Sequence, residues 1–392
     1  MKVALLTGGK DQHYVRGLAR QLAARGVDIA LVGGTDEMVT VGSTSGKVVL
    51  HDVVGNLDPH AGWFAKAIRV LKYYVGLAIF AFRTDAKLFH ILWFRKFPQV
   101  ERVLLTLYLK LLRKTLVFTA HNVDDRARDG RRGGALYALS LRFLYRLADH
   151  VLVHTKSMKL ELSRDFGIPG ERVTVVPLGI NDVIPVASTT QAIAREKLGL
   201  ATDARVLLFF GNIAPYKGLE DLVRALAALV EDDDRFVLLI VGRVRDRSSE
   251  PYWREVEQLI ADLKMRDYVR HDVRYVHDEE VGLFFRAADV SILPYRRVYQ
   301  SGVLGLSYAQ GVPVIAADIA SMKEDIVEGH TGFLFRASDW GDLAAKVRMY
   351  YASDLFKELE AKRVAITRHG GERFAWATNA DRTRTVYEEL LR

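Results

Sequence analysis

A glycine-bounded loop with one lysine is the first segment whose residues could do chemistry. Gly211 follows the apolar strand predicted over 205–210, and Lys217-Gly218 precedes a helix with leucines on one face. A cation beside the free N–H groups of a helix start favours a phosphate. The spacing is not that of a Walker loop, because Lys217 precedes the second glycine. The alternative is that Lys217 is a solvated surface charge.

A second anion site is indicated where a helix begins at Ser301-Gly302, between the buried strands predicted over 290–293 and 314–317. In such a βαβ unit the carboxyl end of the strand faces the amino end of the helix. The alternative is that Ser301 only caps a structural helix.

Two further segments lie at strand ends in the first half. His121 and Asn122 end the strand predicted over 116–120, and Gly8-Gly9 follow the strand over 2–6. The glycines do not form a full dinucleotide fingerprint, and their simplest role is a close backbone turn under a ligand. His121 should face the ligand side of the sheet. The alternative is a turn residue whose hydrogen bonds are satisfied within the protein.

Strands and helices alternate through both halves, which predicts two α/β, Rossmann-like domains with a ligand cleft between facing strand ends. The predicted domains are residues 1–184 and 190–369, and a C-terminal helix over 370–392 is expected to pack on the first domain. The linker is placed at 181–190. Predicted strands are 2–6, 27–32, 88–92, 116–120, 151–155, 173–176, 205–210, 236–241, 269–276, 290–293 and 314–317.

Composition narrows the class further. The chain of 392 residues exceeds one usual core and contains no cysteine, which excludes disulfides and cysteine-based zinc sites. The apolar run at residues 3–6 is too short for a signal peptide. Residues 1–185 hold 27 Lys and Arg against 16 Asp and Glu, whereas the remainder holds 29 against 32. All of the basic excess is therefore in the first half.

Residues 60–114 combine 11 basic and 2 acidic residues with many aromatic ones. Phe64, Ile68, Leu71 and Val75 share one helical face with basic residues beside it, as in a helix bound at a membrane interface. The longest uncharged run, residues 73–82, is too short to span a bilayer. An anionic membrane surface is favoured over two alternatives, ordinary core packing and nucleic acid, because no nucleic-acid motif accompanies the charge.

The ordered series of motifs resembles the family 4 glycosyltransferases, which are nucleotide-sugar enzymes of the two-domain GT-B type. The loop 211–218 is similar to the family's donor loop, and likenesses in the first half include 118–122 and 148–155. The second half contributes 241–242, 288–290, 311–316 and 324–334. The resemblance covers nearly the whole chain. Each motif is weak alone, but the series in order is specific.

The resemblance implies roles for particular residues. Lys217 would bind the donor diphosphate, and the backbone of the helix start at 301–303 would hold the same phosphates. His121 would approach the transferred sugar. The implied catalytic residues are His121 and Lys217, and the acceptor side comprises Gly8, Gly9, His121 and Asn122. The implied donor site comprises Gly211, Asn212, Lys217, Arg243, Arg296, Gln300, Ser301, Gly302, Val303 and Glu324.

Two departures from the family pattern stand out. The family's paired glutamates would fall at Val298 and Leu306, and Asn212 replaces a common arginine. An apolar side chain cannot accept a hydrogen bond from ribose, so that contact must be moved or lost. Arg243, Arg296 or Arg297, each after a predicted strand, is expected to supply the missing phosphate charge, and Gln300 or Ser301 to take over other contacts.

The function implied is transfer of a sugar from a UDP- or GDP-sugar to a lipid-linked or saccharide acceptor in bacterial cell-surface polysaccharide assembly, with retention. No cofactor or metal is expected, since Lys217 and helix N–H groups can replace a cation. The expected location is cytoplasmic and peripheral, on the inner face of the plasma membrane. Two alternatives remain open: a catalytically inactive nucleotide-sugar-binding subunit, and a nucleotide-sugar epimerase.

Overall fold

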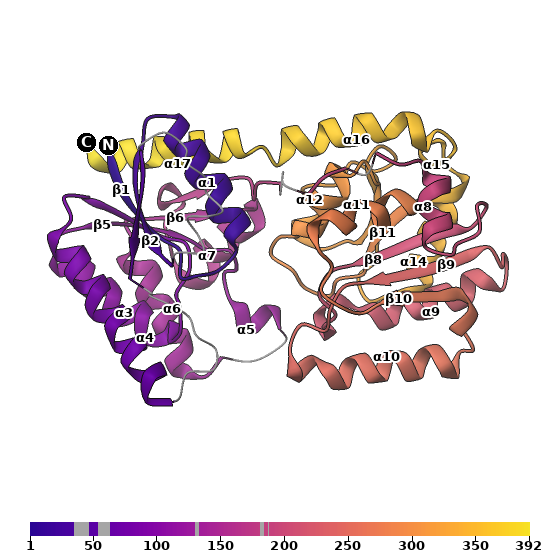
Figure 1. Cartoon of the computed structure of the whole chain (residues 1–392), viewed down its shortest axis with the longest axis horizontal. Coiled ribbons are helices and arrows are strands. Elements are labelled where there is room, and N and C mark those ends of the chain that lie inside the picture. Colours follow the sequence, from indigo (N-terminus) through magenta and orange to yellow (C-terminus); the bar gives the residue numbers. More distant parts are fainter. Residues whose placement is uncertain (35–46, 54–62, 130–132, 181–183, 187) are drawn as a thin grey trace. The chain divides into compact units, whose positions relative to one another are not determined.

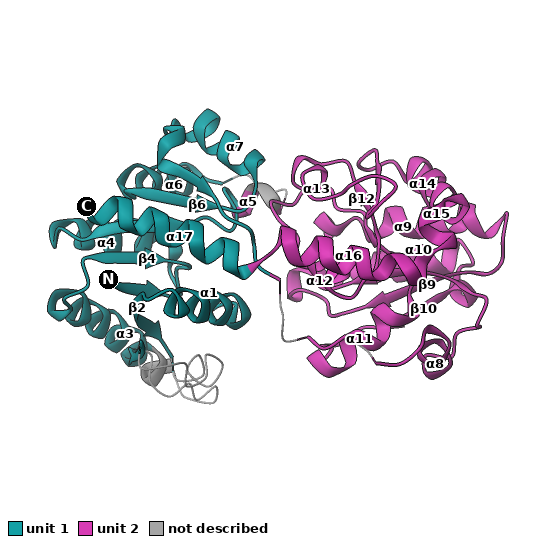
Figure 2. Cartoon of the chain, turned by 90° about the horizontal axis from the view of Figure 1, so that it is seen from above, with its two compact units in different colours: residues 1–124, 132–179, 376–392 teal, residues 125–131, 180–375 magenta. Residues whose placement is uncertain are grey.

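The computed structural model describes residues 1–34, 47–53, 63–129, 133–180, 184–186 and 188–392. The chain forms two compact units, each built on a parallel sheet (Figures 1 and 2). Unit 1 comprises Met1–Asp124, Arg132–Gly179 and Trp376–Arg392, and unit 2 comprises Asp125–Arg131 and Ile180–Ala375. The prediction of two Rossmann-like α/β domains is confirmed.

The units divide a few residues away from the predicted boundaries. Apart from the short segment Asp125–Arg131, the chain enters unit 2 after Gly179 and leaves it after Ala375, whereas the boundaries were expected at 184, 190 and 369. Residues 181–183 and 187 of the predicted linker, and residues 60–62 of the basic segment, lie outside the described residues.

Unit 1 contains a seven-stranded sheet in the order β3-β2-β1-β4-β5-β6-β7, and every pair is parallel. Its strands are β1 (Lys2–Leu6), β2 (Asp28–Gly33), β3 (Val48–Asp52), β4 (Leu88–Ile91), β5 (Thr115–Thr119), β6 (His150–Val153) and β7 (Val173–Val175). Its helices are α1 (Gln12–Ala24), α3 (Trp63–Arg83), α4 (Pro98–Leu111), α6 (Ala135–Leu147), α7 (Lys156–Phe166) and α17 (Trp376–Leu391).

Unit 2 contains a six-stranded parallel sheet in the order β10-β9-β8-β11-β12-β13. Its strands are β8 (Arg205–Phe210), β9 (Phe236–Val241), β10 (Val269–Asp272), β11 (Val290–Leu293), β12 (Val314–Ala317) and β13 (Gly332–Phe335). Its helices are α5 (Asp125–Arg128), α8 (Gln191–Lys197), α9 (Leu219–Val230), α10 (Glu250–Asp262), α11 (Asp278–Ala287), α12 (Gly302–Ala309), α13 (Ala320–Lys323), α14 (Trp340–Ala352), α15 (Asp354–Lys357) and α16 (Leu359–Arg373).

Edge strands account for most of the differences from the predicted elements. The predicted strands did not include β3 or β13, which form the outer strands of the two sheets, and β10 ends at Asp272, not at residue 276. The central strands β8, β9, β11 and β12 occur where they were predicted. Central strands are buried on both faces and read as continuous apolar runs, whereas β3 is half-exposed and carries His51 and Asp52.

The C-terminal segment forms two helices that belong to different units (Figure 2): α16 lies in unit 2 and α17 in unit 1. Trp376, the first residue of α17, fills a space that two glycines leave open. A Cβ at Gly17 would lie 2.2 Å from the Trp376 indole, and a Cβ at Gly179 would lie 2.4 Å from it. Farther along α17, the Tyr387 hydroxyl bonds to Nδ1 of the buried His90 at 2.5 Å. The helix is therefore part of the unit 1 core.

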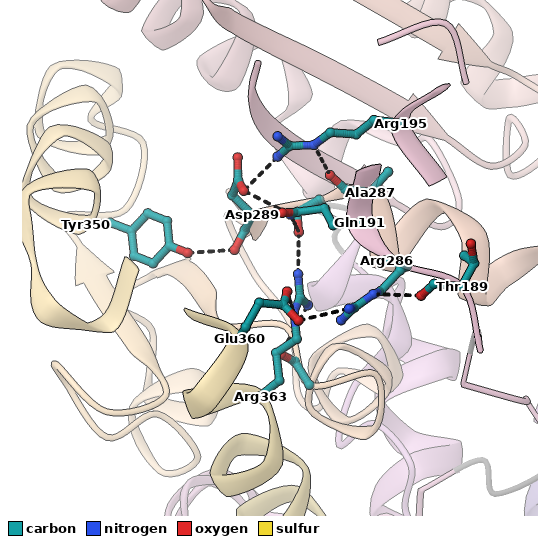
Figure 3. A network of polar contacts seen from close by, with 11 residues as sticks. Thr189, Gln191, Arg195, Arg286, Ala287, Asp289, Tyr350, Glu360 and Arg363 are labelled. Atoms are coloured by element: carbon teal, nitrogen blue, oxygen red, sulfur yellow. Dashed lines mark hydrogen bonds and ion pairs between the residues drawn. The ribbon is translucent and has the colours of Figure 1, made fainter. Parts of the chain in front are cut away.

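A buried ion pair ties the amino end of β11 to its surroundings (Figure 3). The Asp289 carboxylate accepts a hydrogen bond from the Arg195 guanidinium of α8 at 2.8 Å, and both side chains are almost fully buried. The backbone N–H of Val206 and the hydroxyl of Tyr351 also donate to this carboxylate. The 288–290 motif therefore has a structural role, at the end of β11 opposite the donor loop.

We expect Asp289→Asn to lower the free energy of unfolding of unit 2 by ~3 to 5 kcal/mol, because the charge of Arg195 would remain buried without its partner. Urea denaturation followed by circular dichroism measures the change. Asp354→Asn is the matched control, since this carboxylate is 85% exposed in a surface pair with Lys357, and it should change stability by less than ~0.5 kcal/mol. Equal stability of both variants would contradict the role of the pair.

Candidate functional site

The donor loop of unit 2 leaves β8 at Gly211 and is pressed against the end of β11. Pro215–Lys217 form one 3-10 turn, and Gly218, with φ +65°, precedes α9. A Cβ at Gly218 would lie 2.1 Å from the carbonyl oxygen of Pro294. Both the positive φ and this contact require glycine. The glycine thus allows Lys217 to sit beside the chain that follows β11.

Lys217 is buried, and its ammonium contacts Tyr295. Its Nζ donates a hydrogen bond to the Tyr295 hydroxyl at 2.5 Å and lies 3.8 Å from the centre of that ring. Tyr295 itself is fully buried, and burial raises the pKa of its hydroxyl well above the ordinary value. The phenol is therefore neutral and holds the cation through its oxygen and its π-face. Lys217 is therefore buried and held by Tyr295, which is not the position of a solvated surface charge. That it meets a ligand stays a prediction.

The amino end of α12 lies next to this lysine. Ser301 caps the helix by accepting a hydrogen bond from the N–H of Leu304 at 3.2 Å. A Cβ at Gly211 would lie 3.3 Å from Val303 and 4.0 Å from Nζ of Lys217. Gly211, Lys217 and the helix start at 301–303 therefore lie close together.

This group of residues lies at the topological switch point of the sheet. β8 and β11 are neighbours in the sheet. After β8 the chain continues to β9 on one side of this pair, and after β11 it continues to β12 on the other side. Ligands of open α/β sheets bind where such connections diverge. The first N–H groups of α12 have no partner four residues earlier, and their dipoles point to the same place. The arrangement is suited to an anion such as a diphosphate.

Two of the three candidate arginines, Arg243 and Arg296, differ in their partners. Arg243 is exposed and lies beside the donor loop, with its Nε 3.5 Å from Oδ1 of Asn212. Arg296 pairs with two carboxylates of α9, those of Glu220 at 2.6 Å and Asp221 at 3.5 Å. The positive charge of Arg296 is therefore already compensated, and Arg243 is the better placed of the two to meet a ligand.

Two other residues of the predicted donor site, Gln300 and Glu324, lie beside the Ser301 cap and on the connection from β12 to β13. Gln300 is half-buried directly before the Ser301 cap, and its buried amide oxygen makes no hydrogen bond within the described part of the chain. Glu324 ends α13, on the connection from β12 to β13. Leu306 is 8% exposed within the core of unit 2, and the carbonyl of Val298 accepts a hydrogen bond from Ser321. The side chain of Leu306 thus takes part in packing.

Unit 1 has its own group of polar residues at the carboxyl ends of its strands. His121 is buried after β5, stacked on Trp93 with ring centres 4.0 Å apart and in edge contact with Tyr14. Gly8 lies close to Trp93, since a Cβ there would be 2.6 Å from its carbonyl oxygen. Gly9 is exposed and Asn122 half-buried. The structure therefore brings Gly8 and His121 to one place, around the tryptophan that follows β4.

His121 is bonded to a second buried histidine. Its Nδ1 lies 3.1 Å from Nε2 of His154, and the Nδ1 of His154 lies 3.2 Å from the carbonyl oxygen of Val176. Burial lowers the pKa of His154 to about 4 and lowers that of His121 well below its ordinary value. Both rings are therefore neutral near pH 7. The other ring nitrogen of His121, Nε2, is buried without a hydrogen bond to any described residue.

Sequence reasoning missed four residues that shape these sites: Tyr14, Trp93, His154 and Tyr295. Trp93, His154 and Tyr295 follow or end predicted strands, which is the signal that singled out His121. Within the described residues, no three His, Asp or Glu side chains form a group that could hold a metal ion. The expectation that no metal is required stays a prediction.

Each half of the chain matches a family model. Residues 12–183 match "Glycosyltransferase Family 4", and residues 190–368 match "Glycosyl transferases group 1". A D-inositol 3-phosphate glycosyltransferase from Geodermatophilus obscurus is 32% identical over 244 residues, which are 61% of this chain and 52% of the relative. This chain thus spans about half the length of that relative.

Solved structures share the fold over the whole chain. Sucrose-phosphate synthase from Thermosynechococcus elongatus superposes with a TM-score of 0.76 at 20% identity, covering 100% of this chain and 99% of the other. Anabaena HepE in complex with UDP gives a TM-score of 0.76 at 16% identity, covering 99% and 100%. At these identities the likeness establishes the fold.

We expect Arg243→Ala to weaken the binding of UDP about tenfold, because it removes a charge-assisted contact beside the donor loop. Arg296→Ala should change UDP affinity less than about twofold, since the pairs with Glu220 and Asp221 already occupy this guanidinium. Isothermal titration calorimetry measures both. Arg254→Ala, at a side chain 76% exposed on α10, is the control. Unchanged affinity in both test variants would show that neither arginine compensates for Asn212.

Proposed function

Because the chain belongs to the family 4 type of glycosyltransferase, we propose that it transfers a sugar from a UDP- or GDP-sugar to a lipid-linked or saccharide acceptor. The observation that carries the proposal is the site at the switch point of unit 2. There a buried lysine, two glycines and a helix start lie close together. HepE, whose fold is similar, is solved with UDP and with UDP-glucose. A role in bacterial cell-surface polysaccharide assembly is part of this proposal.

The proposed chemistry follows from the charge that develops on the leaving group. Breaking the bond between sugar and phosphate places negative charge on the diphosphate oxygens. The Lys217 ammonium and the first N–H groups of α12 stabilise that charge in a buried, low-dielectric place, where electrostatic effects are larger than in water. The departing phosphate then assists removal of the acceptor proton, so the reaction proceeds with retention and needs no separate base.

A catalytically inactive nucleotide-sugar-binding subunit is the second candidate. It is favoured by the position of Leu306, which is buried in the core where the family places a carboxylate. The two candidates share a nucleotide site and differ in turnover. Incubation of the nucleotide sugar with the protein, with and without acceptor lipids, and detection of released nucleoside diphosphate separates them.

A thermal-shift panel of UDP, GDP, ADP and their sugars tests the site. At 100 times its dissociation constant, a ligand should stabilise the wild type by ~2.7 kcal/mol. Lys217→Gln should abolish most of that shift and lower turnover at least about a hundredfold, because it removes the cation at the leaving group. Lys197→Gln, at an exposed position of α8, is the control. A full ligand shift in Lys217→Gln would refute the role of this lysine.

We further propose that the protein binds an anionic membrane through α3 and α4. These helices are neighbours. The Tyr108 hydroxyl of α4 donates to the carbonyl of Ala78 in α3, and the Tyr74 hydroxyl of α3 donates to the Glu101 carboxylate of α4. Their outer faces expose a group of large apolar side chains, here called the α3–α4 surface: Ile68, Leu71, Val75, Ile79, Phe82, Val100, Leu104, Leu107 and Leu111. Side chains this exposed do not serve as core.

Charge on the same helices fits an anionic surface. The exposed cations include Lys72 and Arg83. Both acidic residues of the segment are already engaged, since Asp85 pairs with Lys2 and Glu101 is buried and accepts backbone hydrogen bonds. Among the described residues, no helix has the length and apolar composition needed to cross a bilayer. Binding at the surface, through apolar insertion and basic residues, is the mode we propose.

Vesicle flotation tests this surface. We expect binding to vesicles that contain about one third phosphatidylglycerol and loss of that binding in high salt, because charges near a lipid surface are screened. Leu71→Gln combined with Phe82→Gln should weaken binding at least about tenfold, whereas Leu160→Gln on α7, 70% exposed, should not. Absence of salt-sensitive binding by the wild type would make the enzyme independent of the membrane.

A further inference from the structure

Unit 1 contains a cavity that the proposed transfer reaction does not use. It has a volume of about 1130 Å³ and lies between the helix α3 and the edge strand β3. Lys2, which begins β1, and Asp85, shortly before β4, line it at the amino ends of these strands. Gly8 and His121, in contrast, follow the carboxyl ends of β1 and β5. The β3–α3 cavity is therefore a separate site from the group around His121.

One face of α3 lines this cavity with an apolar middle and cations at both ends. Its residues recur at helical spacing: Arg69, Lys72, Gly76, Phe80 and Arg83. The helix between Lys72 and Arg83 carries no charge and rises about 16 Å. One leaflet of a bilayer contains ~15 Å of hydrocarbon, half of the ~30 Å core. The length of the uncharged wall therefore suits one acyl chain.

The strand side completes the apolar wall. The Phe80 ring contacts the His51 ring with centres 4.6 Å apart, and Leu50 and Val53 line the cavity beside them. Burial and the positive charge of Lys2 lower the pKa of His51, so this ring is neutral near pH 7. His51 therefore adds contact area to the wall and no charge.

The charges that line the cavity leave an excess of cations. Lys2 and Asp85 pair with each other. The other charged side chains of the lining are Asp52, Arg69, Lys72 and Arg83. Lys72 and Arg83 are exposed, and neither forms an ion pair with a described residue. An anionic group in the cavity would thus meet uncompensated positive charge at either end of the apolar stretch.

Gly76 is the position at which the cavity can be blocked. A glycine within a helix is less favourable than alanine, so helix formation does not explain it. A Cβ at Gly76 would lie 3.7 Å from Val53, which is an ordinary contact distance, so alanine fits there. A large side chain would extend into the cavity, because Gly76 is part of its wall. Substitution here fills the cavity and leaves its charges in place.

The cavity is continuous with the α3–α4 surface. Ile68 and Ile79 belong to both, and their side chains are 53% and 48% exposed. A chain that leaves a bilayer at this surface would therefore reach the cavity over apolar side chains. A free phosphate, in contrast, would leave the apolar wall without a partner.

We propose that the β3–α3 cavity binds one molecule of an anionic phospholipid. An acyl chain lies along Gly76, Ile79 and Phe80, and the phosphate meets the cations that end the uncharged stretch. The inference rests on the proposed membrane binding for the source of the lipid. It adds a site for a single lipid molecule, which is distinct from adsorption to a bilayer.

Short-chain lipids, dissolved as monomers, test the cavity without a membrane. We expect native mass spectrometry of the full-length protein to show one bound dihexanoyl phosphatidylglycerol, and calorimetry to give its affinity. Dihexanoyl phosphatidylcholine, which has the same chains and no net charge, should bind at least about tenfold more weakly. Glycerol phosphate, which has no chains, should also bind at least about tenfold more weakly. Equal affinity for either comparison compound would overturn the assignment.

Two sets of variants place the lipid. Gly76→Phe should weaken the binding of dihexanoyl phosphatidylglycerol at least about tenfold, whereas Gly76→Ala should stay within about twofold, because only phenylalanine fills the cavity. Lys72→Gln combined with Arg83→Gln should lower this affinity to that of the phosphatidylcholine. The control, Lys197→Gln combined with Arg254→Gln at exposed positions of unit 2, should not. Undiminished binding in either test variant would show that the lipid lies elsewhere, and the charge variants decide if thermal melting shows Gly76→Phe to be unfolded.

Vesicle flotation separates this inference from the membrane proposal. If the wild type floats with anionic vesicles but binds no short-chain lipid, the α3–α4 surface stands and the cavity site is wrong. If it binds the short-chain lipid at the cavity but does not float, the site stands and the membrane proposal is wrong.

Discussion

The contact between the Lys217 ammonium and Tyr295 is the constraint on which the candidate anion site of unit 2 depends. An ammonium that is buried loses its hydration, and it is tolerated only where fixed groups replace water. Here a neutral phenol does so, through its oxygen at 2.5 Å and its ring at 3.8 Å. Because Tyr295 comes from the loop after β11 and Lys217 from the loop after β8, the contact also joins the two sides of the switch point.

Close backbone approach is what makes that contact possible. A Cβ at Gly218 or at Gly242 would lie 2.1 Å from a carbonyl oxygen of the neighbouring loop, that of Pro294 or Gly211. Unit 1 follows the same rule, with Gly8 against Trp93 and with Gly17 and Gly179 around Trp376. In both units, therefore, glycines at strand ends, and Gly17 within α1, allow large aromatic or cationic groups to be buried beside them. The requirement is steric, and any side chain at these positions would displace the ligand-facing residues.

Much of this arrangement could be predicted from the sequence, and the rest depends on contacts between distant segments. The central strands and the donor loop are legible because burial on both faces gives continuous apolar runs. The glycines and the lysine of the loop 211–218 are a second signal, which indicates an anion site. The pairing of Arg296 with Glu220 and Asp221 is not legible, since it joins residues 75 or more positions apart. The contact of His154 with His121 is hidden for the same reason. The strand β3 was missed because it is half-exposed and lacks the buried apolar pattern, whereas β13 is buried but only four residues long and begins with a glycine.

The absent carboxylates at Val298 and Leu306 change how binding energy is distributed over the donor. Leu306 has an apolar side chain that is packed in the core, so it cannot form a hydrogen bond with a ribose. A lost hydrogen bond of this kind costs ~0.5 to 3 kcal/mol when nothing replaces it. In the proposed donor site the remaining contacts would be electrostatic and directed at phosphate, from Lys217, the α12 amino end and Arg243. Such contacts do not distinguish one nucleoside from another, so selectivity for the donor must come from groups that touch the base or the sugar.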